Sequence, residues 1–279
     1  MGGLFNSLQI TGIAKAITDV AGINAPLKAE NSNSVILNSA KALFKNERAD
    51  RVFIYSPDAI ALWLFQKYTA MFENMFLLSD IQIPLLSVMP SVTPVCFASM
   101  YTGAIPAVHG IQAYEKPILK TDTVFDAFLR AGKKPAIVST FDVSMSRIFL
   151  DRDMDYFIYG TIEECNKKAL DLIEKDCHDL IVLYNGNYDA VMHRNGPESE
   201  NSMSELKNNI ETFGLLVSHI EKHWRNHRTM IGFCPDHGRH EIDGNLGSHG
   251  LNSAEDMNVI HFYKFINPYT LDESCDDFE

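Results

Sequence analysis

Short apolar runs rich in β-branched and aromatic residues recur along most of this 279-residue chain, and stretches with helical spacing separate most of them. The runs predict strands at 51–56, 81–88, 134–140, 155–160, 179–185, 229–235 and 258–265. The helical stretches are 59–76, 94–102, 121–131, 162–176 and 203–227. Because strands buried on both faces read as near-continuous apolar runs, the alternation predicts an α/β fold with a mostly parallel central sheet and helices on both faces.

The same pattern suggests how the chain is organised. Residues 1–48 read as helix, loop and helix, and we expect them to form an N-terminal appendage. Residues 49–270 contain the alternating pattern and form the expected α/β domain, and the acidic residues 271–279 are expected to be a solvated tail. Neither an internal repeat nor a long linker interrupts the pattern.

Charge and composition narrow the classes of partner. The chain has 24 basic and 36 acidic residues, a formal charge of −12, which argues against nucleic acid polymers and anionic membranes as general partners. The N-terminus lacks a signal-peptide pattern, and the apolar runs are far shorter than the ~20 residues that a membrane span needs. Five widely spaced cysteines without a CxxC pair suggest a reducing compartment. We therefore expect a cytoplasmic protein; the sequence leaves its oligomeric state open.

Polar residues that can do chemistry follow several of the predicted strands. In sheets of this kind, ligands bind beyond the carboxyl ends of the strands. The residues expected at that edge are three carboxylates, three imidazoles and one hydroxyl: Asp58, Asp189, Asp236, His193, His237, His249 and Thr93. The sequence therefore predicts a polar site at one edge of the sheet.

Aspartate and histidine together are ligands for Zn²⁺ or a similar divalent ion, and six such groups exceed the three that one catalytic zinc commonly uses. Two ions can hold the attacking and departing oxygens of an in-line displacement, which favours phosphoryl transfer. Thr93 is the expected nucleophile, activated by a metal because no histidine lies near it in sequence. We expect Thr93 to cap a helix that has Pro94 as its first residue, so that free N–H groups face a bound anion.

Four segments in order resemble the alkaline phosphatase superfamily, and most closely its nucleotide pyrophosphatase/phosphodiesterase and phosphonoacetate hydrolase branch. MPSVTPVCFASMYTGAIPAVHGI resembles the nucleophile segment, which contains Thr93. NYDAVMHRNGP resembles the Asp-x-x-x-His-x-x-Gly-Pro motif, PDHGRH the Asp-His-Gly motif and GSHG the final His-Gly. The resemblance covers roughly residues 50–265 and implies an alkaline phosphatase-like fold, here minimal because only 11 residues separate His237 from His249.

The resemblance also implies roles for the residues. One ion would be held by Asp189, His193 and His249. The other would be held by Asp58, Asp236, His237 and the oxygen of Thr93, which would form a phosphothreonine intermediate. The expected ions are Zn²⁺, with Mn²⁺ as the alternative. The residues considered for substrate binding are Cys96, Asn187, Tyr188 and Arg239.

The expected activity is hydrolysis of small-molecule phosphoric esters, with diester, pyrophosphate-type or phosphonate substrates favoured. A phosphomutase or phosphotransferase of the same superfamily, and a non-catalytic metal-binding descendant, are the alternatives. The last is kept open by Cys96, which stands where relatives of this branch have an asparagine that donates to the phosphoryl group.

Three histidines at i, i+4 and i+8 lie outside these motifs. His219, His223 and His227 share one face of a predicted helix. That spacing can chelate a metal and is also typical of a solvated helix face.

Overall fold

A central sheet of seven strands organises the computed structural model, which describes residues 5–268. Its order across the sheet is β2-β9-β6-β1-β5-β3-β4. Neighbouring strands pair in parallel except where β9 runs antiparallel to both β2 and β6. The strands are β1 (Arg51–Pro57), β2 (Ile81–Leu86), β3 (Pro135–Thr140), β4 (Asp155–Tyr159), β5 (Leu180–Asn185), β6 (Thr229–Phe233) and β9 (Asn258–Ile266). All seven predicted strands are present, and the α/β fold with a mostly parallel sheet is confirmed.

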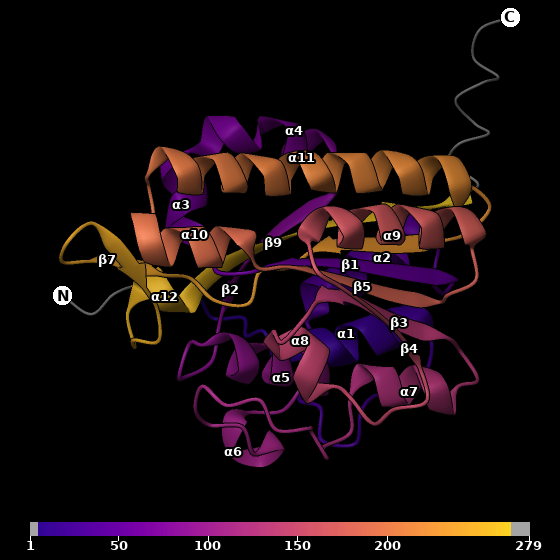
Figure 1. The fold of residues 1–279 in the computed structure, drawn as a ribbon. Coiled ribbons are helices and arrows are strands. Elements are labelled where there is room, and N and C mark those ends of the chain that lie inside the picture. The colour runs from indigo at the N-terminus through magenta and orange to yellow at the C-terminus, as the bar shows by residue number, and fades with distance from the viewer. Residues whose placement is uncertain (1–4, 269–279) are drawn as a thin grey trace, which may run out of the picture.

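Helices cover both faces of this sheet (Figure 1). One face carries α1 (Gly12–Ala21), α2 (Ser34–Leu43), α5 (Thr93–Thr102), α7 (Val124–Arg130) and α8 (Ser144–Ile148). The other carries α3 (Leu62–Lys67), the 3₁₀ turn η1 (Thr69–Phe72), α4 (Glu73–Leu77), α9 (Ile162–Lys175), α10 (Asn187–Asn195) and α11 (Glu200–His223). Side chains of β1 alternate between the two layers: Val52 and Ile54 pack on the first face, and Phe53 and Tyr55 on the second. This double burial explains why the strands lack a polar face in sequence.

The N-terminal helices are part of the packing on the first face. Ile13 and Ile17 of α1 and Ile36 of α2 belong to the same core as the apolar residues of α5 and β1. These contacts fix α1 beside the helix that begins at Thr93. The division of the chain near residue 49 stays a prediction, and the predicted acidic tail at 271–279 lies outside the described residues.

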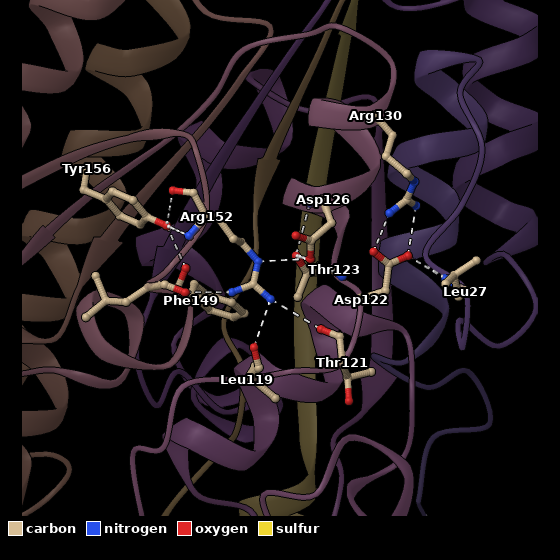
Figure 2. A network of polar contacts seen from close by, with 11 residues as sticks. Leu27, Leu119, Thr121, Asp122, Thr123, Asp126, Arg130, Phe149, Arg152 and Tyr156 are labelled. Carbon is tan, nitrogen blue, oxygen red and sulfur yellow. Dashed lines mark hydrogen bonds and ion pairs between the residues drawn. The ribbon is translucent and has the colours of Figure 1, made fainter.

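Arg152, which precedes β4, fixes the loop that leads to α7, as Figure 2 shows. Its guanidinium donates to the carbonyls of Leu119 and Thr121 and to the carboxylate of Asp126, at 3.2, 3.4 and 3.0 Å. Asp126 also forms a capping box with Thr123 at the start of α7. The network therefore anchors the segment from Leu119 to Asp126, which leads into α7.

Short elements complete the described chain. They are α6 (Pro106–His109), the hairpin of β7 (His240–Ile242) and β8 (Leu246–Ser248), and α12 (Ala254–Met257). The four cysteines among residues 5–268 are free thiols. Over the same residues, no helix combines the length and the apolar character that crossing a bilayer requires. The cytoplasmic location stays a prediction.

Candidate metal centre

Three adjacent strand ends bring the predicted polar residues to one place. β1 lies between β5 and β6, so Asp58 after β1 is flanked by the segments that follow its two neighbours. The backbone N–H of Asp58 donates to the carbonyl of Asn185 at 2.9 Å, and that of Ala59 donates to the carboxylate of Asp236 at 3.4 Å. These contacts fix the loop after β1 between the other two.

The first group of side chains surrounds the hydroxyl of Thr93. Thr93 Oγ1 lies 3.3 Å from Asp58 Oδ2 and 3.3 Å from His237 Nε2. His237 Nε2 lies in turn 3.3 Å from Asp58 Oδ1 and 3.5 Å from Asp236 Oδ2. All four side chains are buried. One ligand atom from each of Asp58, Asp236 and His237 falls within 4.8 Å of the other two, close enough for one ion to contact all three.

The second group consists of Asp189, His193 and His249, which meet by the same measure. Asp189 Oδ1 lies 3.3 Å from His193 Nε2 and 3.5 Å from His249 Nε2. Asp189 and His193 stand one turn apart on α10, and β8 ends immediately before His249. The rings of His249 and His237 are 4.2 Å apart between centroids, so the two groups adjoin. The structure thus assembles both groups with the membership that the resemblance implies; their roles as ligands stay predictions.

Backbone carbonyls orient all three histidines. Each ring uses Nδ1 to donate to a carbonyl: His193 to Gly247 at 2.9 Å, His237 to Gly238 at 2.9 Å and His249 to Ser91 at 3.1 Å. A ring that donates through Nδ1 keeps the lone pair of Nε2 for a metal ion. The three Nε2 atoms are the ones that face the carboxylates.

The carboxylates have the properties expected of a site for cations. Buried oxygens of Asp58, Asp189 and Asp236 make no hydrogen bond within the described part of the chain, although buried polar atoms are normally paired. Burial, together with the charge of Asp189, raises the pKa of Asp58 to about 6, and burial raises that of Asp236 well above its usual value. Burial also lowers the pKa of His249 to about 3, with the charge of His237 acting in the same direction. The residues present therefore fit two divalent cations, which would offset the crowded negative charge.

A cavity of about 220 Å³ opens onto Asp58, Thr93 and Asp189. Lys116 is the single cationic side chain that lines it within residues 5–268. The first residues of four helices lie in its wall: Thr93 of α5, Ser144 of α8, Ile162 of α9 and Asn187 of α10. Helix N-termini carry partial positive charge, so the cavity suits a compact anionic group.

Three residues that contact the centre or its cavity are not predicted by the sequence: Tyr114, Lys116 and Tyr184. Tyr184 donates its hydroxyl to Asp58 Oδ2 at 2.5 Å, and Tyr114 and Lys116 bring a loop into the cavity wall. Tyr184 is the penultimate residue of a predicted strand, and its contact with Asp58 can be inferred only once the face of the sheet that its side chain occupies is known. No periodicity marks the loop that carries Tyr114 and Lys116.

Two features of the nucleophile segment differ from the sequence expectation. Helix α5 begins at Thr93, one residue earlier than expected, with Pro94 second. The N–H groups of Val95 and Cys96 both donate to the carbonyl of Val92, so they are not free for an anion as expected. Cys96 is buried, and its sulfur accepts a hydrogen bond from the hydroxyl of Ser87 at 3.1 Å. The side chain at that position therefore contacts the protein interior.

Of the other residues considered for substrate binding, Asn187 lines the cavity, and Tyr188 and Arg239 do not. Both are fully buried, with the guanidinium carbon of Arg239 4.5 Å from the centroid of the Tyr188 ring. Arg239 also donates to the carbonyl of Pro197 at 2.9 Å, and burial lowers its pKa to about 9. Arg239 is therefore not a solvated loop residue, and the ring of Trp63 packs against the second side of its guanidinium.

Comparison with solved structures identifies the same architecture in murine ectonucleotide pyrophosphatase/phosphodiesterase 5. An inactive variant in complex with AMP matches 70% of this chain and 59% of its own, with a TM-score of 0.56 and 18% identity. A second murine structure matches 70% of this chain and 58% of its own, with a TM-score of 0.55 and 18% identity. The human protein matches 69% of this chain and 58% of its own, with a TM-score of 0.54 and 17% identity. The chain thus spans under two thirds of the length of these neighbours. Neither models of protein families nor curated proteins match the sequence.

At this identity the similarity establishes a shared fold. It confirms, at the level of architecture, the resemblance to the nucleotide pyrophosphatase/phosphodiesterase branch that the four motifs indicate.

Proposed function

We propose that the chain is a metal-dependent hydrolase of phosphoric esters that uses Thr93 as its nucleophile and binds two divalent ions. The observation that carries the proposal is the position of the Thr93 hydroxyl. It lies 3.3 Å from both Asp58 and His237, beside two groups of three ligands and at the wall of a cavity. A threonine that served only to start a helix would not require six side chains capable of binding metal around it, five of them buried or half-buried.

In this reaction Thr93 Oγ1 gives up its proton to solvent and forms a bond to phosphorus. The bond from phosphorus to the leaving oxygen breaks, and that oxygen takes up a proton from solvent. Asp58 and His237 hold the Thr93 hydroxyl in place, and water then releases the phosphate from the threonine. Lys116 and the Asn187 side chain are placed to bind phosphoryl oxygens, since the N–H groups of Val95 and Cys96 are already bonded. Asn187 would thus supply the amide that the branch places three residues after its nucleophile.

Asp58, Asp236, His237 and Thr93 would hold one ion, and Asp189, His193 and His249 the other. Divalent ions bound there supply Lewis acidity, which lowers the pKa of the attacking hydroxyl or water and stabilises the leaving oxygen. Two imidazoles and one carboxylate in the second group favour Zn²⁺ over harder ions such as Mn²⁺.

The volume of the cavity limits how much of the substrate it can enclose. Its volume of about 220 Å³ is below the ~300–1,000 Å³ of sites that enclose a whole drug-sized ligand. We infer that it encloses the phosphoryl group and a small part of the ester, with the rest at the surface. Diester, pyrophosphate-type and phosphonate substrates fit this description, and the AMP complex of the murine neighbour suggests nucleotide-type groups for the first substrate panel.

The test compares Thr93→Ala with Thr93→Ser, which keeps a hydroxyl. We expect the alanine variant to lose at least a thousandfold in hydrolysis of nitrophenyl phosphate mono- and diesters while it retains its metal content. The serine variant should keep measurable turnover and trap a phosphorylated side chain on acid quenching. Full activity in Thr93→Ala would reject the covalent mechanism.

The two alternative functions give different products. A phosphotransferase would pass the phosphoryl group to an acceptor alcohol, so product analysis with and without glycerol separates it from a hydrolase. A protein that bound two ions and hydrolysed no member of a broad ester panel would be a non-catalytic descendant.

A further inference from the structure

A further cluster of side chains that could ligate a metal ion lies at the C-terminal ends of α9 and α11, outside the centre around Thr93. It consists of Glu174, His219 and His223, whose ligand atoms lie within 4.8 Å of one another. The two helices run side by side over the same face of the sheet (Figure 1), and the indole of Trp224 joins them by donating to the carbonyl of Ile173 at 2.9 Å. The cluster therefore sits where the protein already holds the two helices together.

The geometry of the cluster follows from helical spacing. His219 and His223 are four residues apart on α11, so their rings stack along one face with centroids 4.5 Å apart. His219 Nε2 lies 3.1 Å from Glu174 Oε1 of α9. The Nε2 atoms of both histidines are shielded from solvent, and neither makes an aligned hydrogen bond within residues 5–268. Shielded nitrogens without such a bond are uncommon in native structures and call for a partner.

His227, the third histidine of the sequence pattern, does not join them. Helix α11 ends at His223, so the i+8 spacing no longer places His227 on the same face. Its Nε2 instead pairs with Asp176 at 2.6 Å. Glu174, from the neighbouring helix, takes its place beside the other two rings.

We propose that Glu174, His219 and His223 form a binding site for a zinc-like divalent ion, separate from the centre around Thr93. Two imidazole nitrogens and one carboxylate oxygen are the donor set that Zn²⁺ and Cu²⁺ accept, and water would complete the coordination. Helix α9 begins beside the cavity at Ile162 and continues for 14 residues to Lys175. At ~1.5 Å per residue the two sites are about 18 Å apart along that helix. The ion would join the ends of α9 and α11 and take no part in ester hydrolysis.

Trp224 makes the site measurable on its own. The chain has two tryptophans, and a Trp63→Phe variant leaves only Trp224, adjacent to His223 in sequence. Cu²⁺ quenches the fluorescence of a nearby indole, so we expect saturable quenching at micromolar Cu²⁺ in this variant. His223→Gln added to it should raise the half-saturation concentration at least tenfold. His227→Gln, the matched control, should leave it unchanged. Half-saturation in the millimolar range, or equal curves for the two glutamine variants, would overturn the proposal.

Zinc stoichiometry gives a second readout that does not depend on the centre around Thr93. After equilibrium dialysis against Zn²⁺, His223→Gln and Glu174→Gln should each contain one ion fewer than the parent, and His227→Gln the same number. If the centre around Thr93 bound no ions, the difference of one would persist and only the total would fall. Unchanged zinc content in His223→Gln, with native circular dichroism, would refute the site.

Discussion

Tyr184→Phe should weaken metal binding at the centre without disturbing the fold. The hydroxyl of Tyr184 donates to Asp58 Oδ2 at 2.5 Å, and both side chains are buried. Burial, followed by the charge of Asp58, raises the pKa of Tyr184 well above its usual value, so the phenol remains a donor at neutral pH. The substitution removes one hydrogen bond and leaves the carboxylate in place.

The magnitude follows from the kind of bond that is lost. A hydrogen bond to a charged group contributes ~1.5–3 kcal/mol, which is about a 10- to 100-fold change in an equilibrium constant. Loss of a group that orients a metal ligand typically lowers affinity by about the same factor. The bond also lowers the pKa of Asp58, against burial that raises it to about 6, so its removal should favour the protonated acid. The affinity loss should therefore be larger at pH 6 than at pH 8.

The assay is competition for Zn²⁺ against a chromophoric chelator, repeated at both pH values. Tyr101→Phe is the matched control, since Tyr101 is another buried tyrosine and its hydroxyl meets the neutral hydroxyl of Ser56 at 2.9 Å. We expect the control to bind zinc like the parent. Zinc affinity within twofold of the parent in Tyr184→Phe, or an equal loss in Tyr101→Phe, would show that the phenol does not orient Asp58.

Three further predictions concern stability. Burial lowers the pKa of His261 to about 4, so between pH 6.5 and 4 the unfolded chain binds a proton that the folded chain does not. The free energy of unfolding, measured by urea denaturation, should fall by up to about 3 kcal/mol as the pH is lowered from 6.5 to 4. A free energy that does not change with pH over this range would contradict the lowered pKa of His261. Gly238→Ala should destabilise by about 3 kcal/mol because its Cβ would lie 2.0 Å from the carbonyl oxygen of Glu255, whereas Gly160→Ala, with 3.5 Å to the nearest atom, should be neutral in thermal unfolding. Arg152→Met should lower stability by about 3 kcal/mol because it leaves the carbonyls of Leu119 and Thr121 without a donor and removes the cation beside the Asp126 carboxylate, and a melting temperature equal to the parent's would argue against the network in Figure 2.

Most of the sheet could be predicted because its five inner strands are buried on both faces, which leaves continuous apolar runs in the sequence. The edge strands β2 and β4 are partly exposed. The hairpin of β7 and β8 was missed, although Asp243 and Gly244 at its turn are a recognised hairpin signal. Its strands are three residues long and partly exposed, so they carry no apolar pattern.

The two groups of proposed metal ligands have the membership that the family resemblance implies. Three of the four motifs follow strands of the central sheet, and His249 follows β8 of the hairpin. The directions of side chains could not be predicted. Arg239 follows the Asp-His pair closely in sequence, yet the backbone turns it between Tyr188 and Trp63 and away from the cavity. Lys116 lines the cavity, and its ammonium donates to the backbone carbonyl of Asp142, 26 residues further along the chain. The local sequence around Lys116 does not predict such a contact.

Main-chain oxygens, present whatever residue occupies a position, set the tilt of the rings of His193, His237 and His249. Mutations that exchange the neighbouring side chains can therefore accumulate without rotating an imidazole, provided that the path of the backbone is kept. A fold built in this way can therefore diverge far in sequence while its imidazoles keep their orientation.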